Sequence, residues 1–320
     1  MKIVITPGLT LSTVGEDDVE RIRRAGGGAA VVVSEGDAVL NEMTDAEVVL
    51  GTVSRRTFAA AKKLRWVHAI ASGVDAYLFD EFKNSEVILT CEKGLVGEHL
   101  ADHAFGLLLM LTRQLAAAAH LGPDAWNHRW ELRAKEFELT GSTMGVFGFG
   151  GTGRAVARRA AAFGMRVMAL DRDPVPASPE VDGVLGSDGF DQLLAESDVL
   201  SVCCPLTRET RDLFDSEAFR RMRSNAILVN VTRGEVMVEE DLVGALLSGA
   251  IRGAALDVAP REPLPPDSPL WRLPQVVMSP HTAGASQFRT ARNLDRFVGN
   301  LEKLRRGEPL EGVVDKQRGY

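Results

Sequence analysis

The chain has 320 residues, of which 45% are apolar and 25% charged, and a formal net charge of −7. This length predicts two domains, and the composition is typical of a folded globular protein rather than a disordered chain. The negative charge and the scattered arginines argue against a nucleic-acid partner, which would need a basic face.

The N-terminus and the cysteines predict a cytoplasmic protein without a membrane contact. The first apolar run, Lys2–Thr6, is far too short for a signal peptide and is typical of a strand. Because Cys203 and Cys204 are adjacent and Cys91 is distant, no disulfide framework is expected, in keeping with a reducing compartment.

The first hundred residues alternate short β-rich runs with helical patterns, which predicts a parallel α/β sheet. We expect strands at residues 2–6, 29–33, 48–51, 66–70 and 87–91, and helices at residues 16–25 and 55–63. The triplet Gly26-Gly27-Gly28 follows a helix rather than a strand, so we interpret it as a helix stop and not as a phosphate loop.

Residues 71–75, Ala-Ser-Gly-Val-Asp, follow the fourth expected strand. Ligands bind at the carboxyl ends of strands in open α/β sheets, and small side chains such as Ser72 and Gly73 leave the backbone N–H groups accessible to an anion. The same sequence is also typical of a plain turn, so both interpretations stay open at this point.

Residues 98–115 form a helical pattern with little polar face, which predicts a buried helix between domains or in a subunit interface. It lacks 18 consecutive apolar residues, so we do not expect it to span a membrane. His99 and His103 lie one turn apart beside Glu98 and Asp102, but this is not H-E-x-x-H and no third ligand follows. We therefore expect ordinary polar contacts and no metal.

Residues 122–141 contain Pro123, Trp126, Trp130 and mixed charges, and we expect an irregular connection. We interpret the two tryptophans as packing anchors rather than ligand contacts. The segment should lead into the second domain.

Residues 148–153 carry a complete G-x-G-x-x-G between an apolar strand at 144–147 and a helix at 154–163. The first glycine permits a tight turn, the second lets the backbone approach a pyrophosphate, and the third lets helix and strand pack closely. The helix N-terminus favours the phosphate charge. We therefore expect a dinucleotide to contact Gly148, Gly150, Gly151, Thr152 and Gly153.

A second strand at residues 166–170 follows a helix stop at Gly164 and ends in Asp171. Asp171 lies 18 residues beyond Gly153, the distance at which a carboxylate binds the ribose hydroxyls of NAD. A 2′-phosphate would meet like charge there, so we expect NAD rather than NADP as the cofactor. Arg172 is a complication, because its side chain could turn toward a phosphate.

The rest of the chain continues the parallel pattern, with strands expected at residues 198–204, 225–231, 253–258 and 275–278 and helices at 216–222 and 239–247. Arg233, Glu262 and His281 each follow a different strand. They are therefore expected at the edge of the sheet that binds the dinucleotide. Arginine can bind a carboxylate and polarise a carbonyl, histidine can exchange a proton, and a carboxylate can orient the imidazole, which together suit hydride transfer to a 2-keto acid.

The chain resembles the D-isomer-specific 2-hydroxyacid dehydrogenase family over nearly its whole length. The matching segments are residues 71–75, 148–153, 162–167, 204–207, 230–234, 257–258, 262–263 and 279–281. The resemblance implies an NAD-dependent homodimer with two parallel-sheet α/β domains around a cleft. It also implies a discontinuous substrate domain, here residues 1–97 and 287–320, beside an NAD-binding domain at residues 98–286.

Carried across by motif, the resemblance implies that Arg233 binds the substrate carboxylate and carbonyl, that His281 is the general acid/base and that Glu262 is its partner. The backbone at Ser72 and Gly73 would hold the substrate carboxylate. Further cofactor contacts are implied at Cys204, Pro205, Val231, Thr232, Asp257, His281 and Gly284. Many members carry histidine where this chain has Cys203, so that cofactor-side contact stays open.

The sequence does not select one substrate among glyoxylate, hydroxypyruvate, pyruvate and larger 2-keto acids. Phosphite oxidation on the same scaffold is an alternative, and so is a non-catalytic NAD(H)-sensing protein of the corepressor type. Turnover of 2-keto acids by NADH separates these alternatives.

Overall fold

A computed structural model describes residues 1–181 and 183–320 and divides the chain into two compact units. Unit 1 comprises Met1–Val96 and Ala285–Tyr320, and unit 2 comprises Gly97–Gly284. The sequence predicted that the first segment of the substrate domain ends at residue 97 and that the second begins at residue 287. In the structure these boundaries lie at Val96 and Ala285. Each unit is built on a parallel sheet covered by helices, which confirms the predicted α/β fold class.

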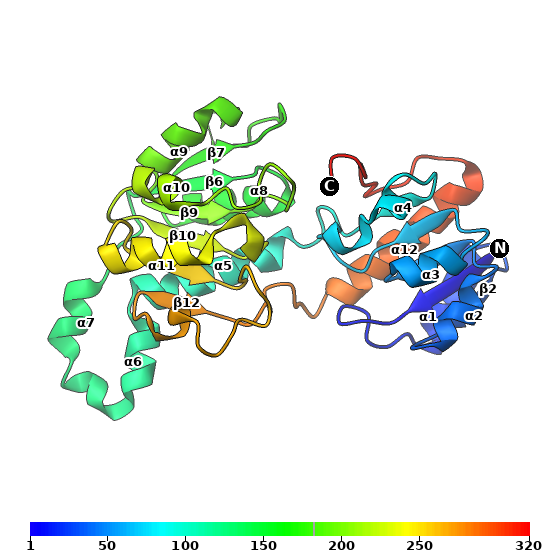
Figure 1. The fold of residues 1–320 in the computed structure, drawn as a ribbon, viewed down its shortest axis with the longest axis horizontal. Helices are drawn as coiled ribbons and strands as arrows, with labels where there is room; N and C mark the ends of the chain where they lie inside the picture. Colours follow the sequence, from blue (N-terminus) through cyan, green and yellow to red (C-terminus); the bar gives the residue numbers. More distant parts are fainter. Residues whose placement is uncertain (182) are drawn as a thin grey trace. The chain divides into compact units, whose positions relative to one another are not determined.

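Unit 1 contains a five-stranded parallel sheet in the order β2-β1-β3-β4-β5 within its described residues. Its strands are β1 (Lys2–Thr6), β2 (Ala30–Val33), β3 (Val48–Gly51), β4 (Trp66–His68) and β5 (Ile88–Thr90). Its helices are α1 (Glu16–Ala25), α2 (Ala38–Met43), α3 (Arg55–Ala60), α4 (Asp80–Lys83) and α12 (Arg289–Arg306), with the 3-10 turn η1 (Asp75–Tyr77). Helices α1 and α12 cover one face, around Trp66 and Phe297, and α2, α3 and α4 cover the other, around Phe82 (Figure 1).

Unit 2 contains a seven-stranded parallel sheet in the order β12-β11-β10-β9-β6-β7-β8 within its described residues. Its strands are β6 (Thr143–Phe147), β7 (Arg166–Leu170), β8 (Val184–Leu185), β9 (Val199–Val202), β10 (Ile227–Asn230), β11 (Gly253–Leu256) and β12 (Val276–Met278). The chain adds β7 and β8 on one side of β6 and then β9 to β12 on the other. The order therefore reverses between β6 and β9, the kind of position where open α/β sheets bind ligands.

The helices of unit 2 form two layers and an arm. They are α5 (Gly97–Thr112), α6 (Leu115–Leu121), α7 (Arg129–Lys135), α8 (Gly151–Ala162), α9 (Phe190–Glu196), α10 (Ser216–Arg221) and α11 (Glu239–Ser248), with the 3-10 turns η2 (Gly122–Trp126), η3 (Ser187–Gly189), η4 (Gly234–Val236) and η5 (Pro269–Arg272). Helices α5 and α8 pack on one face of the sheet, and α9, α10 and α11 pack on the other.

Helix α5 is buried, as its apolar sequence predicted. Its buried residues include Phe105, Leu108 and Leu111, which pack among strand residues of the sheet. The helix ends at Thr112 rather than Leu115, because Gln114 adopts a left-handed backbone with φ of 54° and starts a new helix, α6.

The prediction of an irregular connection at residues 122–141 was wrong for much of its length, because the segment contains η2 and α7. Together with α6 they form an arm that protrudes from unit 2 (Figure 1). The base of the arm is closed by Phe137 N, which donates to Thr112 O at 2.9 Å. The side chains of Trp126 and Trp130 are each 78% exposed, so within this chain they are not the packing anchors that we predicted.

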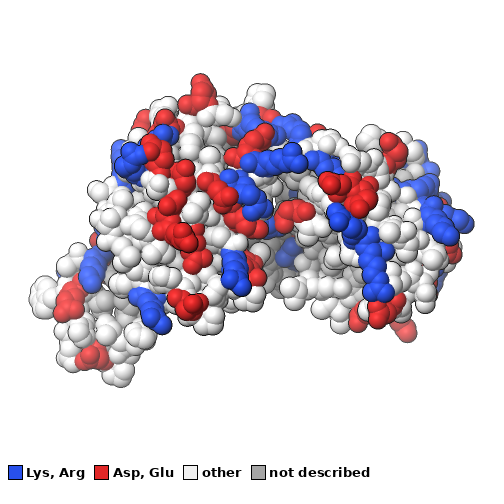
Figure 2. Space-filling view, viewed as in Figure 1, with Lys and Arg blue, Asp and Glu red and all other residues white. Residues whose placement is uncertain are grey.

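Acidic and basic side chains are interspersed over the face of the molecule that Figure 2 shows. Within residues 1–181 and 183–320, no single helix has both the length and the apolar character needed to cross a bilayer. The pair Gly97–Thr112 and Leu115–Trp126, bent by 64°, meets that test by length and composition alone.

Candidate active site

The glycine loop lies between β6 and α8, at the switch point of the sheet of unit 2. Gly148 has φ of 98°, and a Cβ there would lie 2.7 Å from the backbone nitrogen of Cys204. A Cβ on Gly153 would lie 2.1 Å from the carbonyl oxygen of Gly148, so close helix–strand packing requires glycine at this position too. A Cβ on Gly150 would meet open space, which leaves the backbone accessible to a ligand.

Helix α8 begins at Gly151, three residues earlier than predicted, so its N-terminal N–H groups belong to the glycine loop itself. The first N–H groups of a helix have no intrahelical acceptor and favour a bound phosphate. The close approach at Gly148 and Gly153 and the open space at Gly150 are the features that a pyrophosphate requires. The loop therefore fits a dinucleotide.

Asp171 directly follows β7 and is fixed against the glycine loop. One carboxylate oxygen, Oδ2, accepts from Phe149 N at 2.7 Å, and Oδ1 accepts from Asp173 N at 3.0 Å. The neighbouring Arg172 forms an ion pair with Glu209, which lies in the loop after β9. The half-buried Asp171 carboxylate is thus held at the strand end where a ribose is expected.

Cys203 and Cys204 follow β9 beside the glycine loop. Cys203 N donates to Phe147 O at 2.8 Å, and the Cys203 thiol lies 3.4 Å from the hydroxyl of Ser201. Burial raises the pKa of Cys203 to about 12 and also raises the pKa of Cys204. Both thiols therefore stay protonated near neutral pH and act as small apolar groups.

His281 and Glu262 form a direct pair. His281 Nδ1 and Glu262 Oε2 are 2.7 Å apart, and the two side chains are 45% and 39% exposed. The other carboxylate oxygen of Glu262 accepts from Ala259 N at 3.1 Å, which fixes its orientation. His281 has a left-handed backbone with φ of 54°, so the turn after β12 directs this side chain. Because Nδ1 is engaged, Nε2 is the ring atom left to exchange a proton with a substrate.

Asp257, which follows β11, organises the turn that carries His281. Its side chain is fully buried, and its two oxygens accept from Ser279 Oγ at 2.6 Å, Thr282 N at 2.9 Å and Ala283 N at 2.8 Å. The backbone N–H of His281 donates to Asp257 O at 2.8 Å. The Asp257 carboxylate therefore holds the histidine turn, and the cofactor contact that the resemblance implies for Asp257 stays a prediction.

His103 of α5 also contacts this turn. Its Nε2 lies 2.7 Å from Ser279 Oγ and 3.3 Å from Asp257 Oδ1. The expected polar contact at the start of this helix is confirmed for His103. Across the two described ranges, no group of three or more His, Cys, Asp or Glu side chains is arranged to hold a metal ion.

Arg233 follows β10, next to β11 in the sheet. Asn230, the buried last residue of β10, donates to Arg233 O at 2.9 Å and accepts from Thr232 N at 3.0 Å, which shapes the turn. A Cβ on Gly234 would lie 1.9 Å from the carbonyl carbon of Ala259, so this turn packs directly on the segment that leads to Glu262.

The three predicted catalytic residues thus follow three adjacent strands, β10, β11 and β12, at one edge of the sheet. The remaining predicted cofactor positions follow strands of the same sheet. Val231 and Cys204 are buried, and Pro205 is exposed. Thr232 is held by Asn230, and Gly284 is the last residue of unit 2. Sequence reasoning missed Asn230, Ser279 and His103 as positioning residues. A polar residue that ends an apolar strand, such as Asn230, is the signal that identifies such a role.

Ser72 and Gly73 lie in unit 1, after β4, and are half-buried. The strand ends at His68, two residues earlier than predicted, so both residues belong to the loop at the carboxyl edge of that sheet. Ala71 O, just before them, accepts from Glu92 N at 3.2 Å. The predicted position of this segment at a strand end is therefore confirmed, and its ligand stays a prediction.

A dinucleotide loop at a switch point, with a paired histidine at the same sheet edge, is the arrangement of an NAD-dependent oxidoreductase. The comparisons with known proteins identify the family. Residues 105–283 match the model described as "D-isomer specific 2-hydroxyacid dehydrogenase, NAD binding domain". The chain belongs to the D-isomer-specific 2-hydroxyacid dehydrogenase family, so it is an oxidoreductase acting on CH–OH donors with NAD(P) as its cofactor.

Named relatives are similar over most of the chain. A glyoxylate reductase of Korarchaeum cryptofilum is 36% identical over 290 residues, covering 89% of this chain and 84% of the relative. A glyoxylate reductase/hydroxypyruvate reductase of Mus musculus is 35% identical over 250 residues, covering 76% of this chain and 74% of the relative. The solved structure of an NADPH-dependent glyoxylate/hydroxypyruvate reductase from Sinorhizobium meliloti, in complex with NADP and sulfate, is 28% identical, with a TM-score of 0.83 and coverage of 100% of both chains.

Proposed function

We propose that the chain transfers a hydride between NAD(H) and a small D-2-hydroxy acid or 2-keto acid, with His281 as general acid/base, Glu262 as its partner and Arg233 as the substrate-binding cation. The observation that carries this proposal is the 2.7 Å contact between His281 and Glu262 at the sheet edge that holds the glycine loop. The relatives named glyoxylate reductase favour glyoxylate or hydroxypyruvate as the substrate.

The nicotinamide, when bound, supplies or accepts the hydride. In reduction, protonated His281 donates a proton from Nε2 to the developing alkoxide, and in oxidation the neutral imidazole removes it. Glu262, ionised and bound to Nδ1, fixes the ring orientation and stabilises the imidazolium. Arg233 binds the substrate carboxylate with its planar fork and polarises the 2-carbonyl, which a lysine would do poorly. The backbone N–H groups of Ser72 and Gly73 are the proposed contact of unit 1 with the substrate carboxylate.

The glycine loop and Asp171 support a preference for NAD over NADP. The Asp171 carboxylate repels a 2′-phosphate, and the neighbouring Arg172 is paired with Glu209. We further propose cofactor contacts at Cys204, Pro205, Val231, Thr232, Asp257, His281 and Gly284.

We also propose a cytoplasmic homodimer that uses the arm of unit 2. Trp126 and Trp130 are largely exposed there. Leu115, at the start of α6, and Met110, in α5, are also exposed. Large exposed aromatic side chains at one place are typical of an interface between subunits. Sedimentation of the wild type and a Trp126→Ser/Trp130→Ser variant tests this, and an unchanged oligomeric state would reject the arm as the interface.

The function is tested by NADH oxidation against a panel of 2-keto acids: glyoxylate, hydroxypyruvate, pyruvate and a longer analogue. We expect turnover with the small members, and a kcat lowered by about 10² to 10⁴ in a His281→Asn variant, which tolerates the left-handed backbone but lacks the acid. NADH binding without turnover on any member would favour an NAD(H)-sensing protein instead. NAD reduction by phosphite alone would favour the phosphite alternative.

A further inference from the structure

Unit 1 contains a buried ionic cluster outside the site described above. Glu92 follows β5 and its side chain is only 1% exposed. Its carboxylate accepts from Arg289 Nε at 3.1 Å, from Arg289 Nη2 at 2.5 Å and from Asn293 Nδ2 at 3.1 Å. Glu92, Arg289 and Asn293 are called the Glu92 cluster below. Arg289 and Asn293 lie one turn apart at the start of α12, so one face of this helix binds the segment that follows β5.

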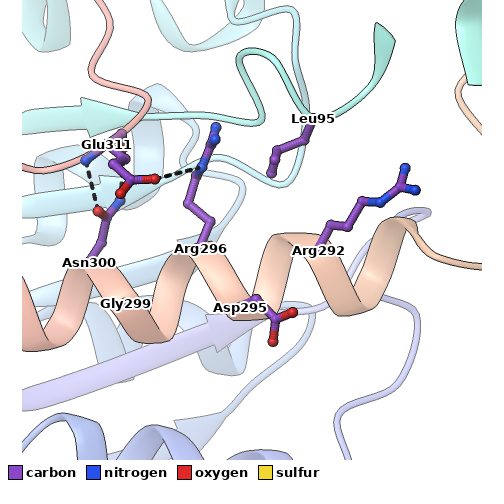
Figure 3. Close-up of a pocket in the computed structure, with 7 residues that line it drawn as sticks. All are labelled: Leu95, Arg292, Asp295, Arg296, Gly299, Asn300 and Glu311. Atoms are coloured by element: carbon purple, nitrogen blue, oxygen red, sulfur yellow. Dashed lines mark hydrogen bonds and ion pairs between the residues drawn. The ribbon is translucent and has the colours of Figure 1, made fainter. Parts of the chain in front are cut away.

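The next turn of α12 continues the same contact. Arg296 Nη1 donates to Lys93 O at 2.5 Å and lies 3.4 Å from Cys91 O. Figure 3 shows Arg296 extending from α12, with Glu311 and Asn300 beside it at the rim of a pocket of about 360 Å³. Helix α12 therefore binds residues 91–93 through the carboxylate of Glu92 and through the carbonyl oxygens of Cys91 and Lys93.

The held segment is bonded to the loop proposed to bind the substrate carboxylate. Glu92 N donates to Ala71 O at 3.2 Å, directly before Ser72 and Gly73. A displacement of Glu92 is therefore transmitted to the 71–73 backbone through this hydrogen bond. We propose that the Glu92 cluster is a positioning device for the substrate loop, so that Glu92 and Arg289 set substrate affinity without touching substrate. This inference rests on the proposed role of Ser72 and Gly73.

The chemistry of the cluster supports a geometric role. Burial of a carboxylate costs several kcal/mol unless it is paired and hydrogen-bonded, and well-packed apolar residues usually stabilise such a position at least as well. A directional guanidinium fork instead fixes both the distance and the orientation of its partner. Arg289 and Glu92 are 197 residues apart in sequence, so the pair also fixes the start of α12 against the end of β5.

The experiment compares Glu92→Gln and the milder Asn293→Ala with the wild type in glyoxylate reduction. We expect KM for glyoxylate to rise by about tenfold to a hundredfold in Glu92→Gln, as a displacement near 1 Å does, with less change in kcat. The Kd for NADH should not change, because the glycine loop belongs to unit 2. Amide hydrogen exchange at residues 71–73 should become faster in the same variant.

The control is Ile22→Ala, which destabilises unit 1 by removing a buried side chain of α1 from the hydrophobic cluster around Trp66, whose members include none of residues 71–73 or 91–93. It should lower Tm while leaving KM and exchange at residues 71–73 unchanged. If Glu92→Gln and Asn293→Ala behave like this control, the positioning role is overturned. A second variant, Gly73→Val, crowds the loop and tests the proposed carboxylate site, which fails if KM is unchanged. In that case the amide exchange rates at residues 71–73 in Glu92→Gln still decide whether the Glu92 cluster fixes the loop.

Discussion

The two units each hold a functional loop at the carboxyl edge of a parallel sheet, but they hold it by different means. In unit 2 the buried carboxylate of Asp257 accepts from the hydroxyl of Ser279 and from two backbone N–H groups of the turn that carries His281, and His103 Nε2 lies 3.3 Å away. In unit 1 the buried carboxylate of Glu92 is bound by the charged Arg289 and by Asn293. The difference follows from distance along the chain.

Asp257 and the turn it holds belong to adjacent strands, so backbone N–H groups are within reach. Glu92 binds a helix from the far end of the sequence, and the side chains of Arg289 and Asn293 bridge the two elements. Local turns can thus be fixed by neutral hydrogen bonds, whereas distant elements need a directional side-chain pair. This comparison predicts that variants at the histidine turn of unit 2 alter proton transfer, and that variants of the Glu92 cluster in unit 1 alter substrate affinity.

The largest effect should come from His281→Ala. We expect kcat to fall by about 10² to 10⁴, the usual range for a positioned acid/base group, with the Kd for NADH retained. Steady-state kinetics with glyoxylate and a fluorescence titration of NADH measure the two quantities. His281→Asn should behave alike, and an undiminished kcat in both variants would end the proposed mechanism.

Cofactor choice should show the next largest effect. At about 4 Å the Asp171 carboxylate and a 2′-phosphate repel by about 1 to 4 kcal/mol, or roughly tenfold to a thousandfold in kcat/KM in favour of NADH over NADPH. Asp171→Ser should narrow this ratio, whereas Glu92→Gln should leave it unchanged. Equal kcat/KM for the two cofactors in the wild type would contradict the role of Asp171.

Asp257→Asn tests how the histidine turn is held. The amide group presents a donor where Thr282 N and Ala283 N both require acceptors, so the turn should shift. We expect kcat to fall by about tenfold to a hundredfold through misplacement of His281, with a lower Tm. Kinetics and thermal unfolding measure both effects. A variant that loses stability but keeps kcat would show that the turn is fixed by other contacts.

Glu262→Gln should retain more activity than His281→Ala, because the amide oxygen can still bind the imidazole ring. Loss of the carboxylate charge beside Nδ1 removes a charge-assisted hydrogen bond, so kcat should fall, but by less than in His281→Ala. Steady-state kinetics of both variants with glyoxylate provide the measurement, and an unchanged kcat in Glu262→Gln would remove Glu262 from this role.

The smallest effect at neutral pH concerns His68, fully buried in unit 1 beside Trp66 and Phe297. Burial, together with the nearby Arg296, lowers the pKa of His68 from 6.5 to about 3. The unfolded chain therefore binds more protons between these values, and stability should fall as pH decreases from about 6.5 toward 3. Thermal unfolding of wild type and His68→Leu at pH 7 and pH 4.5 should show a smaller loss in the variant; equal losses would rule out His68 as the cause.

The sequence by itself determined the features that depend on local order. The run from β6 through the glycine loop and α8 to Asp171 was predicted nearly residue by residue, because each step needs a particular residue type at a fixed spacing. The burial of α5 followed from an apolar sequence with little polar face. The placement of Arg233, Glu262 and His281 at one edge followed because parallel strands end together.

The tertiary structure alone decided which distant groups meet. Nothing near Glu92 in the sequence identifies Arg289 as its partner, and nothing near Asp257 shows that its carboxylate serves the histidine turn. The helices of the arm and the exposure of Trp126 and Trp130 were also missed, since a polar, mixed sequence gives no periodic signal. The physical reason is the same in each case: a strand end or a glycine turn is fixed by its own backbone, whereas a buried pair or an exposed ring depends on what the rest of the fold packs against it.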